Sequence, residues 1–284
     1  MNLDQYVEAY EKTGYVVIPG LLSADETAQL RAVTDALQGE ALGAEGETTV
    51  FDFEPGHRPE APVIQRIKKP HRVNPYYFDL AGHPAILGFL KRVIGADIRL
   101  SHSKINMKAA QLGSALEWHQ DWAFAPHTNM STCVASVMVD SCAVENGAMQ
   151  VIPGSHQGPL FNHHGEDGFF NGAIAPQDLD LTVAKPLTGP AGTVAFHHPK
   201  TVHGSGLNQS GGSRRILFLE YAASDAFPLF YNVDWAEYNS RLVSGPQSSF
   251  VRVEPNEVKL PFPTRAGSSI YKIQATAAAK FFAA

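Results

Sequence analysis

The sequence predicts a mainly β protein with helices flanking its sheets. After about residue 95, short runs rich in Val, Ile, Phe and Thr recur between clusters of Gly, Pro, Asn and Ser. That texture is typical of antiparallel strands folded into a sandwich or barrel. Before that point, amphipathic stripes predict helices that pack on one sheet. With 44% hydrophobic and 18% charged residues, the chain can build a large core, which excludes a disordered protein.

The N-terminal part alternates helix and strand. Apolar residues at helical spacing predict a helix over 3–13, which Gly14 ends before a strand over 15–18. A serine followed three residues later by a glutamate forms a capping box and opens a helix over 23–39. A further helix is expected over 84–94, where a glycine follows.

The β part follows, with two loops expected near its opening. The predicted strands lie around 98–107, 133–139, 149–152, 193–196 and 215–221. Residues 40–62 and 156–180 are rich in turn-forming and polar residues and are expected to form the mouth of a site.

The 284 residues are expected to form one domain, because all-β domains often reach about 200–250 residues as a single unit. Within it we expect a helical N-terminal part over about 1–95, a β core over about 96–225 and a C-terminal extension over about 226–284. The stretch after residue 261 shows no informative pattern.

Composition narrows the function classes. The net charge is 22 − 28 = −6, which argues against a general nucleic-acid or anionic-membrane binder. The start of the chain lacks a basic region followed by an apolar run, and no stretch approaches a membrane span. Cys133 and Cys142 lack metal-site or disulfide spacing, so we expect two buried, inert thiols. A cytoplasmic protein acting on a small molecule is expected, as a monomer or a homodimer.

One short stretch carries metal-site chemistry. His119 and Asp121 are two residues apart in Trp118-His119-Gln120-Asp121-Trp122, and in extended backbone such residues point to one face. His203, 82 residues after Asp121, is the best third ligand, because Greek-key connections return distant strands to the same place. Two imidazoles and one carboxylate suit non-haem Fe(II) oxygen chemistry. Zinc accepts the same ligands, so the metal stays open here.

An arginine follows at a useful distance. Arg214 lies eleven residues after His203, at the start of an apolar run, where a guanidinium would clamp a dicarboxylate. Because both faces of this run are apolar, alternation does not choose between Arg214 and Arg215.

Other histidines are expected to be exposed or hydrogen-bonded structural residues. These are His57, His71, His83, His163, His164 and the turn residue His156.

The motifs together resemble a known family. His119-x-Asp121, the run from Glu145 to His156, and His203-Gly204-Ser205-Gly206 with Arg214 are similar to motifs of the phytanoyl-CoA dioxygenase family of Fe(II)/2-oxoglutarate oxygenases. The similarity spans about residues 14–221.

The resemblance implies a double-stranded β-helix, or cupin-like jelly roll, with helices outside and iron near one open end. It implies Fe(II), 2-oxoglutarate and O2 as the reacting partners. By matching positions, Arg214 would pair with 2-oxoglutarate and Ser205 would hydrogen-bond it. Asn106 and His102 would face the cosubstrate, although relatives often carry Gln in place of His102. Lys104 lies between these two residues, and a structural role, in which its ammonium reaches solvent, is an equal alternative to a role in the site.

The function predicted is therefore hydroxylation, desaturation, epimerisation or cyclisation of a small organic substrate, such as a natural-product intermediate or an amino-acid derivative. Asp121 argues against the related halogenases, which have Gly or Ala at this position. Two alternatives remain: a zinc hydrolase, for which no neighbouring general base is evident, and a non-catalytic jelly-roll binding protein, which does not need an intact ligand set.

Overall fold

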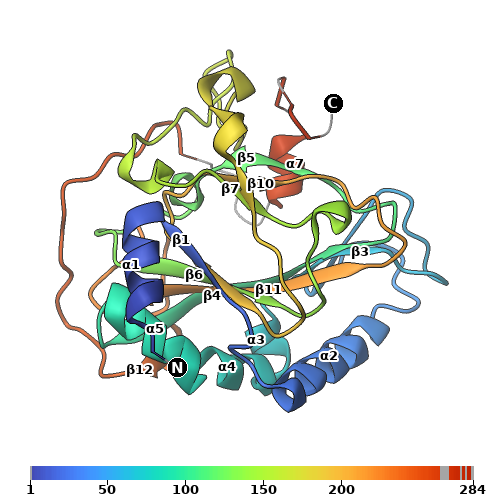
Figure 1. Ribbon diagram of the computed structural model, residues 1–284, viewed down its shortest axis with the longest axis horizontal. Helices are drawn as coiled ribbons and strands as arrows, with labels where there is room; N and C mark the ends of the chain where they lie inside the picture. Colours follow the sequence, from blue (N-terminus) through green and yellow to red (C-terminus); the bar gives the residue numbers. More distant parts are fainter. Residues whose placement is uncertain (1, 263–268, 276, 279, 283–284) are drawn as a thin grey trace.

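Two antiparallel sheets face each other in the computed structural model, which describes residues 2–262, 269–275, 277–278 and 280–282 (Figure 1). The larger sheet has the order β1-β9-β6-β11-β4-β3-β2, with β12 also paired to β4, and the smaller has the order β5-β10-β7-β8. The arrangement is a double-stranded β-helix, so the jelly-roll prediction is confirmed. The strands are β1 Tyr15–Ile18, β2 Phe51–Phe53, β3 Ile64–Lys68, β4 Ile98–Lys108, β5 Leu116–His119, β6 Thr132–Met138, β7 Gln150–Val151, β8 Lys185–Pro186, β9 Val194–His197, β10 His203–Ser205, β11 Arg214–Ala223 and β12 Leu242–Ser244.

Most of the helices cover the side of the larger sheet that faces away from the smaller one, whereas α7 (Ile270–Gln274) lies beside β5 of the smaller sheet (Figure 1). The main core lies between the larger sheet and the helices that cover it, where Phe89 of α5 stacks on Phe196 of β9 with ring centroids 4.2 Å apart. This core leaves the other face of the larger sheet for the space between the sheets. The helices are α1 Asp4–Thr13, α2 Ala24–Gly39, α3 Pro70–Val73, α4 Pro75–Ala81, α5 Pro84–Val93, α6 Trp235–Ser240 and α7 Ile270–Gln274.

The predicted N-terminal elements form for the expected reasons. The capping box of α2 is present, with the Glu26 N–H donating to Ser23 Oγ and the Ser23 N–H donating to the Glu26 carboxylate. Gly14 ends α1 with a φ of 80°, and a Cβ there would lie 2.5 Å from the ring of His156. Only glycine fits this turn.

The structure departs from the predicted loop over 40–62. That segment contains β2, which pairs with β3. Asp52 in β2 is buried and accepts from Arg66 at 2.5 Å and from Lys68 at 2.8 Å, both in β3. Charged residues that pair across two strands hide the apolar alternation on which the prediction depended.

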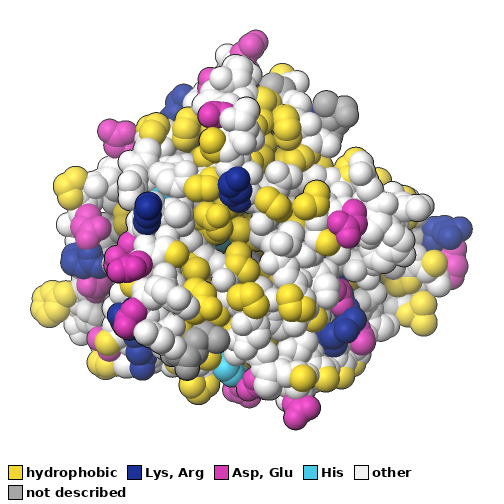
Figure 2. All heavy atoms as spheres, in the orientation of Figure 1, with side chains coloured by type: hydrophobic (Ala, Val, Ile, Leu, Met, Phe, Trp, Pro, Cys, Tyr) yellow, Lys and Arg dark blue, Asp and Glu magenta, His cyan; other side chains and the backbone are white. Residues whose placement is uncertain are grey.

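The surface, the thiols and the helices add three findings. On the face in Figure 2, acidic and basic side chains are interspersed, and hydrophobic side chains gather across the middle. Cys133 and Cys142 are buried and free, as expected. Among the described residues, no helix combines the length and apolar character needed to cross a bilayer.

Candidate active site

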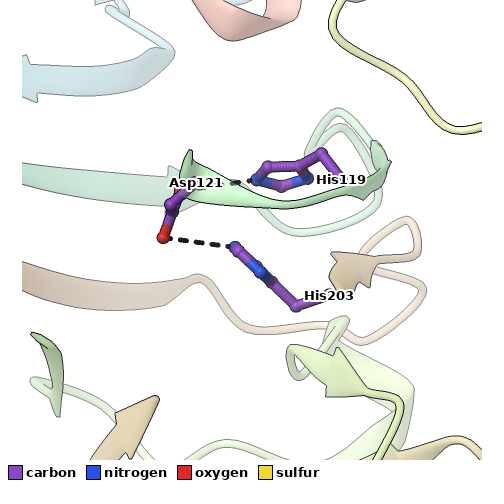
Figure 3. A group of neighbouring side chains, drawn as sticks. All are labelled: His119, Asp121 and His203. Carbon is purple, nitrogen blue, oxygen red and sulfur yellow. Dashed lines mark ion pairs between the residues drawn. The ribbon is translucent and has the colours of Figure 1, made fainter. Parts of the chain in front are cut away.

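Three side chains meet where the smaller sheet brings distant segments together. His203 of β10 lies directly opposite His119 of β5 in the antiparallel register. Gln120 keeps extended backbone, and Asp121 then begins a 3-10 turn, η1 (Asp121–Ala123). The carboxylate of Asp121 points at both imidazoles (Figure 3), and one ligand atom from each residue lies within 4.8 Å of the others. The expected convergence occurs, although extended backbone reaches only Gln120.

The imidazoles of His119 and His203 each turn one nitrogen to the backbone. Nδ1 of His119 lies 2.7 Å from the carbonyl oxygen of Glu117, and Nδ1 of His203 lies 2.9 Å from that of Thr201. A carbonyl only accepts, so each Nδ1 carries the hydrogen and each Nε2 presents a lone pair. His119 Nε2 lies 3.8 Å from Oδ1 of Asp121, and His203 Nε2 lies 3.8 Å from Oδ2 of the same carboxylate. The tautomer and orientation are those of metal ligands, so the residues fit a divalent ion.

The protonation states favour the same use. Burial lowers the pKa of His119 well below its ordinary value and that of His203 to about 4. Burial alone would raise the pKa of Asp121, but His203 nearby and a hydrogen bond from His197 outweigh it and hold this pKa well below its ordinary value. At neutral pH the site therefore offers two neutral imidazoles and one carboxylate.

A cavity beside these residues lies between the two sheets. Part of its wall is one face of the β4–β11 pair, on which Lys104 lies opposite Phe218 and Lys108 opposite Arg214. The Lys104 and Arg214 positions are four residues apart along the ladder, or about 13 Å at 3.3–3.4 Å per residue. The cavity therefore has a Lys104 end and an Arg214 end, with the His and Asp side chains also on its wall.

At one end, Arg214 faces the cavity with an incomplete set of partners. It is 2% exposed and donates to the carbonyl of Gly147, while its Nε has no hydrogen-bond partner among the described residues. Arg215 turns the other way, and its Nε and Nη2 donate to the Asp140 carboxylate at 2.7 and 3.0 Å. Apolar alternation left open which of Arg214 and Arg215 faces the site, and the register of β11 assigns Arg214 to it.

Of the other predicted cosubstrate residues, Ser205 and Asn106 line the cavity and His102 does not. The Asn106 Oδ1 atom is buried and has no hydrogen-bond partner within the described chain. His102 lies opposite Glu220, beyond Lys104 on the strand. Lys104 itself pairs with Glu220 at 3.0 Å and lines the cavity, so its ammonium is directed to the site and not only to solvent.

The C-terminal segment also lines this cavity, which the sequence did not indicate. Ile270 and Tyr271 of α7 contribute to the wall near Arg214. Burial raises the pKa of the Tyr271 phenol to about 12, an effect that Arg214 partly offsets. The only local signal is Ser269, whose Oγ caps the helix by accepting from the Tyr271 N–H. A five-residue helix is too short for apolar periodicity to reveal.

Glu117 fastens this segment to β5. Its buried carboxylate accepts from the backbone N–H groups of Phe281 and Phe282 at 2.7 and 3.2 Å. The Gln274 side chain bonds both the N–H and the carbonyl of Glu117, and Phe282 packs on Trp118 with ring centroids 5.2 Å apart. Glu117 therefore links the strand that carries His119 to the chain that closes the cavity.

The remaining aromatic and histidine side chains near the site are mostly structural. Trp118 and Trp122 are buried, and Phe124 is half-buried and packs edge-on against His119. The histidines expected to be structural each make a hydrogen bond: His57, His71, His83, His156, His163 and His164. In the predicted loop over 156–180, His163 accepts the Gln120 N–H at 2.9 Å, so this loop supports the metal-facing turn.

Comparison with known proteins identifies the family. The family "Phytanoyl-CoA dioxygenase (PhyH)" matches residues 10–216. The chain belongs to the phytanoyl-CoA dioxygenase family. A relative named "Probable alpha-ketoglutarate-dependent hypophosphite dioxygenase", from Stutzerimonas stutzeri, is 35% identical over 99% of this chain and 100% of its own length. An ectoine dioxygenase of Stutzerimonas stutzeri (strain A1501) is 28% identical over 76% of both chains.

Solved structures share the fold. The carbocyclase SnoK of nogalamycin biosynthesis, described as non-haem and alpha-ketoglutarate-dependent, superposes with a TM-score of 0.62 and 25% identity over 86% of this chain and 92% of its own. The apoform of EctD from S. alaskensis gives a TM-score of 0.66 at 23% identity, over 88% and 86%. The protein is thus a non-haem Fe(II)/2-oxoglutarate-dependent dioxygenase.

Proposed function

We propose that this dioxygenase oxidises hypophosphite, or a closely similar small phosphorus oxyanion, at the cavity between the two sheets. The observation that carries the proposal is the 35% identity to the hypophosphite dioxygenase relative over nearly the whole chain. That similarity extends past residue 216, where the family match ends, and so takes in the C-terminal residues that line the cavity.

In this proposal His119, Asp121 and His203 hold the iron. The neutral imidazoles and the ionised carboxylate described above present three donors, which leaves other positions of the metal open. Bound Fe(II) with 2-oxoglutarate and O2 supplies the oxidising chemistry. The side chains of the chain position the reactants.

Arg214 would hold 2-oxoglutarate by its distal carboxylate. Its buried guanidinium keeps an unpartnered Nε, and a buried cation of this kind gains most from a carboxylate. Ser205 and Asn106 line the same cavity and would add hydrogen bonds to the cosubstrate. Neither residue carries a formal charge, so Arg214 dominates the interaction.

The substrate would lie toward the Lys104 end. Burial lowers the pKa of Lys104, but Glu220 and Asp121 outweigh this and raise it, so the ammonium stays charged. It can donate to an oxygen of the phosphorus anion. One atom of O2 enters a P–H bond, which becomes P–O–H, and phosphite forms. The other atom enters succinate as 2-oxoglutarate loses CO2.

The test is turnover of protein purified without oxygen and supplied with Fe(II), 2-oxoglutarate, O2 and hypophosphite. We expect equal amounts of phosphite, measured by phosphorus NMR, and succinate, measured by mass spectrometry. The Asp121→Ala variant should lose at least about 100-fold in rate, because a ligand loss disrupts the metal site more than the loss of a neighbouring hydrogen bond. Wild-type protein that makes succinate but no phosphite contradicts the substrate assignment.

A small organic substrate is the second candidate. Relatives at 25–28% identity are named ectoine dioxygenase and L-proline trans-4-hydroxylase, which supports the expectation of an amino-acid derivative. Parallel reactions with ectoine and L-proline separate the two candidates, since either product gains one oxygen atom. Product from one of these compounds, with none from hypophosphite, would replace the first candidate with the second.

A further inference from the structure

Asp121 has a partner from the opposite sheet. His197, the last residue of β9, is 0% exposed, and its Nε2 lies 3.0 Å from Asp121 Oδ2. β9 belongs to the larger sheet, whereas β5 and β10, which carry His119 and His203, belong to the smaller one. The carboxylate is therefore contacted from both sheets.

The hydrogen bond fixes the role of each ring nitrogen in His197. An ionised carboxylate only accepts, so Nε2 carries the hydrogen and donates to Asp121. The opposite nitrogen, Nδ1, is buried and has no hydrogen-bond partner among the residues described. Apolar packing does not explain a fully buried imidazole with one nitrogen unsatisfied, because an aromatic ring without nitrogen would fill the same space at lower cost. The bond to Asp121 does explain it.

Each of the three metal-facing side chains then has an orienting contact. Backbone carbonyls hold the rings of His119 and His203. Asp121 lies at the start of a 3-10 turn, and its carboxylate accepts a hydrogen bond from His197. The two carboxylate oxygens thereby differ in their contacts. Oδ2 accepts from His197 at 3.0 Å and lies 3.8 Å from His203 Nε2, whereas Oδ1 lies 3.8 Å from His119 Nε2 and has no hydrogen-bond donor among the described residues.

We infer that His197 is a positioning residue that holds the Asp121 carboxylate in the orientation for iron. The inference rests on the proposed metal site and goes beyond it, because it concerns a residue outside the ligand set. Its role is to keep one oxygen of Asp121 aimed at the metal by binding the other. Partners of this type change metal affinity by about 10- to 100-fold.

Two amide substitutions test the inference by geometry. The amide nitrogen of His197→Gln reaches the place of Nε2, whereas that of the shorter His197→Asn does not. Fe(II) binding without oxygen is measured by calorimetry, and the visible spectrum of the Co(II) form reports coordination geometry. We expect His197→Asn to bind Fe(II) about 10- to 100-fold more weakly and to change the Co(II) spectrum. His197→Gln should stay within a few-fold of wild type.

The controls separate positioning from general damage. His198→Gln removes the next imidazole on the chain, which accepts from the Lys200 N–H, and should leave Fe(II) affinity unchanged. Thermal unfolding of the metal-free variants checks folding. If His197→Asn does not fold, His197→Phe, which fills the space without a donor, takes its place and should show the same loss.

The outcomes distinguish failure of this inference from failure of the proposed metal site on which it rests. Wild-type affinity in both His197→Asn and His197→Phe, with an unchanged Co(II) spectrum, overturns the positioning role alone. Equal loss in His197→Asn and His197→Gln also overturns it, because the position of the donor would not matter. Fe(II) binding that is equally weak in wild type and Asp121→Ala overturns the metal site itself.

Discussion

Arg214 and Arg215 are neighbours on β11 that the strand turns to opposite faces. Arg214 faces the cavity with an unpartnered Nε, and Arg215 binds Asp140 on the helical side. We predict that Arg214→Ala weakens 2-oxoglutarate binding roughly 30- to 5,000-fold, since loss of one partner of a buried charge pair costs about 2–5 kcal/mol. Titration of the Fe(II) protein with 2-oxoglutarate, followed by its charge-transfer absorption, measures this. Unchanged affinity would exclude Arg214 from the cosubstrate site.

Arg215→Ala should have the reverse profile. Its guanidinium is buried with the Asp140 carboxylate, so its removal leaves a poorly compensated buried charge. We expect a loss of about 3–5 kcal/mol in the free energy of unfolding, measured by urea denaturation. Folded protein should keep its affinity for 2-oxoglutarate. A variant as stable as wild type would show that this pair does not support the fold.

At the residue scale, sequence spacing predicted the His119 and Asp121 pair because the two ligands lie close together in the chain. His119 and Asp121 are two residues apart, and one extended residue between them, Gln120, is enough to aim both side chains at one point. His197 could not be found in this way. Its partner Asp121 is 76 residues away, and the motif around His203 offers His197 and His198 as equal neighbours until the strand register is known.

At the element scale, one buried carboxylate attaches the C-terminal segment to β5. Glu117 accepts two backbone N–H groups at Phe281 and Phe282. Glu117→Gln removes the charge and one acceptor, which should weaken this attachment by about 1–2 kcal/mol. We expect faster hydrogen exchange at residues 270–275 and 280–282, measured by mass spectrometry, and a raised KM for 2-oxoglutarate because Tyr271 lines the cavity.

The matched control for this change is Glu8→Gln, which alters an exposed glutamate in α1. It should leave exchange in the C-terminal segment unchanged. Exchange in Glu117→Gln that equals the wild-type rate would mean that Gln274 and the packing of Phe282 hold the segment without the carboxylate.

Elements were predictable where one local pattern was enough. The helix α2 follows from its capping box and apolar stripe, and β1 follows from a short apolar run closed by Pro-Gly. The strands β2 and β3 and the helix α7 were not predicted, because their stability comes from partners far along the chain. Asp52 needs the cations of β3, and α7 needs Glu117 on β5. Such pairings have no local signature.

At the scale of the whole molecule, the cavity takes its walls from both sheets. Family resemblance gave the jelly roll, and the register of β4 with β11 then orders the cavity from Lys104 to Arg214. Residue-level patterns alone reached only a sandwich or barrel, because strand order depends on contacts between segments that are distant in sequence. The predictions of one domain, of a cytoplasmic location and of a monomer or homodimer stay predictions.

Buried neutral histidines make the global stability depend on pH. Burial lowers the pKa of His198 to about 3 and that of His163 to about 4, from an ordinary value of 6.5. At pH values between the folded and the unfolded pKa, these histidines are protonated in the unfolded chain but neutral in the folded protein. Stability is therefore complete above pH 6.5 and falls as the pH drops toward about 3. At pH 5 each group contributes a loss of up to about 2 kcal/mol, at 1.4 kcal/mol per pH unit.

Urea unfolding of the metal-free protein at pH 7 and pH 5 measures this dependence. Wild type should lose several kcal/mol, a large part of a typical stability of about 5–15 kcal/mol. His198→Gln should lose less than wild type between the two pH values, whatever its stability at pH 7, because one of the groups that take up a proton on unfolding is gone. An equal pH dependence in variant and wild type would mean that His198 takes up its proton as readily in the folded protein as in the unfolded chain. Its half-buried ring and its bond to the Lys200 N–H would then not be enough to lower its pKa.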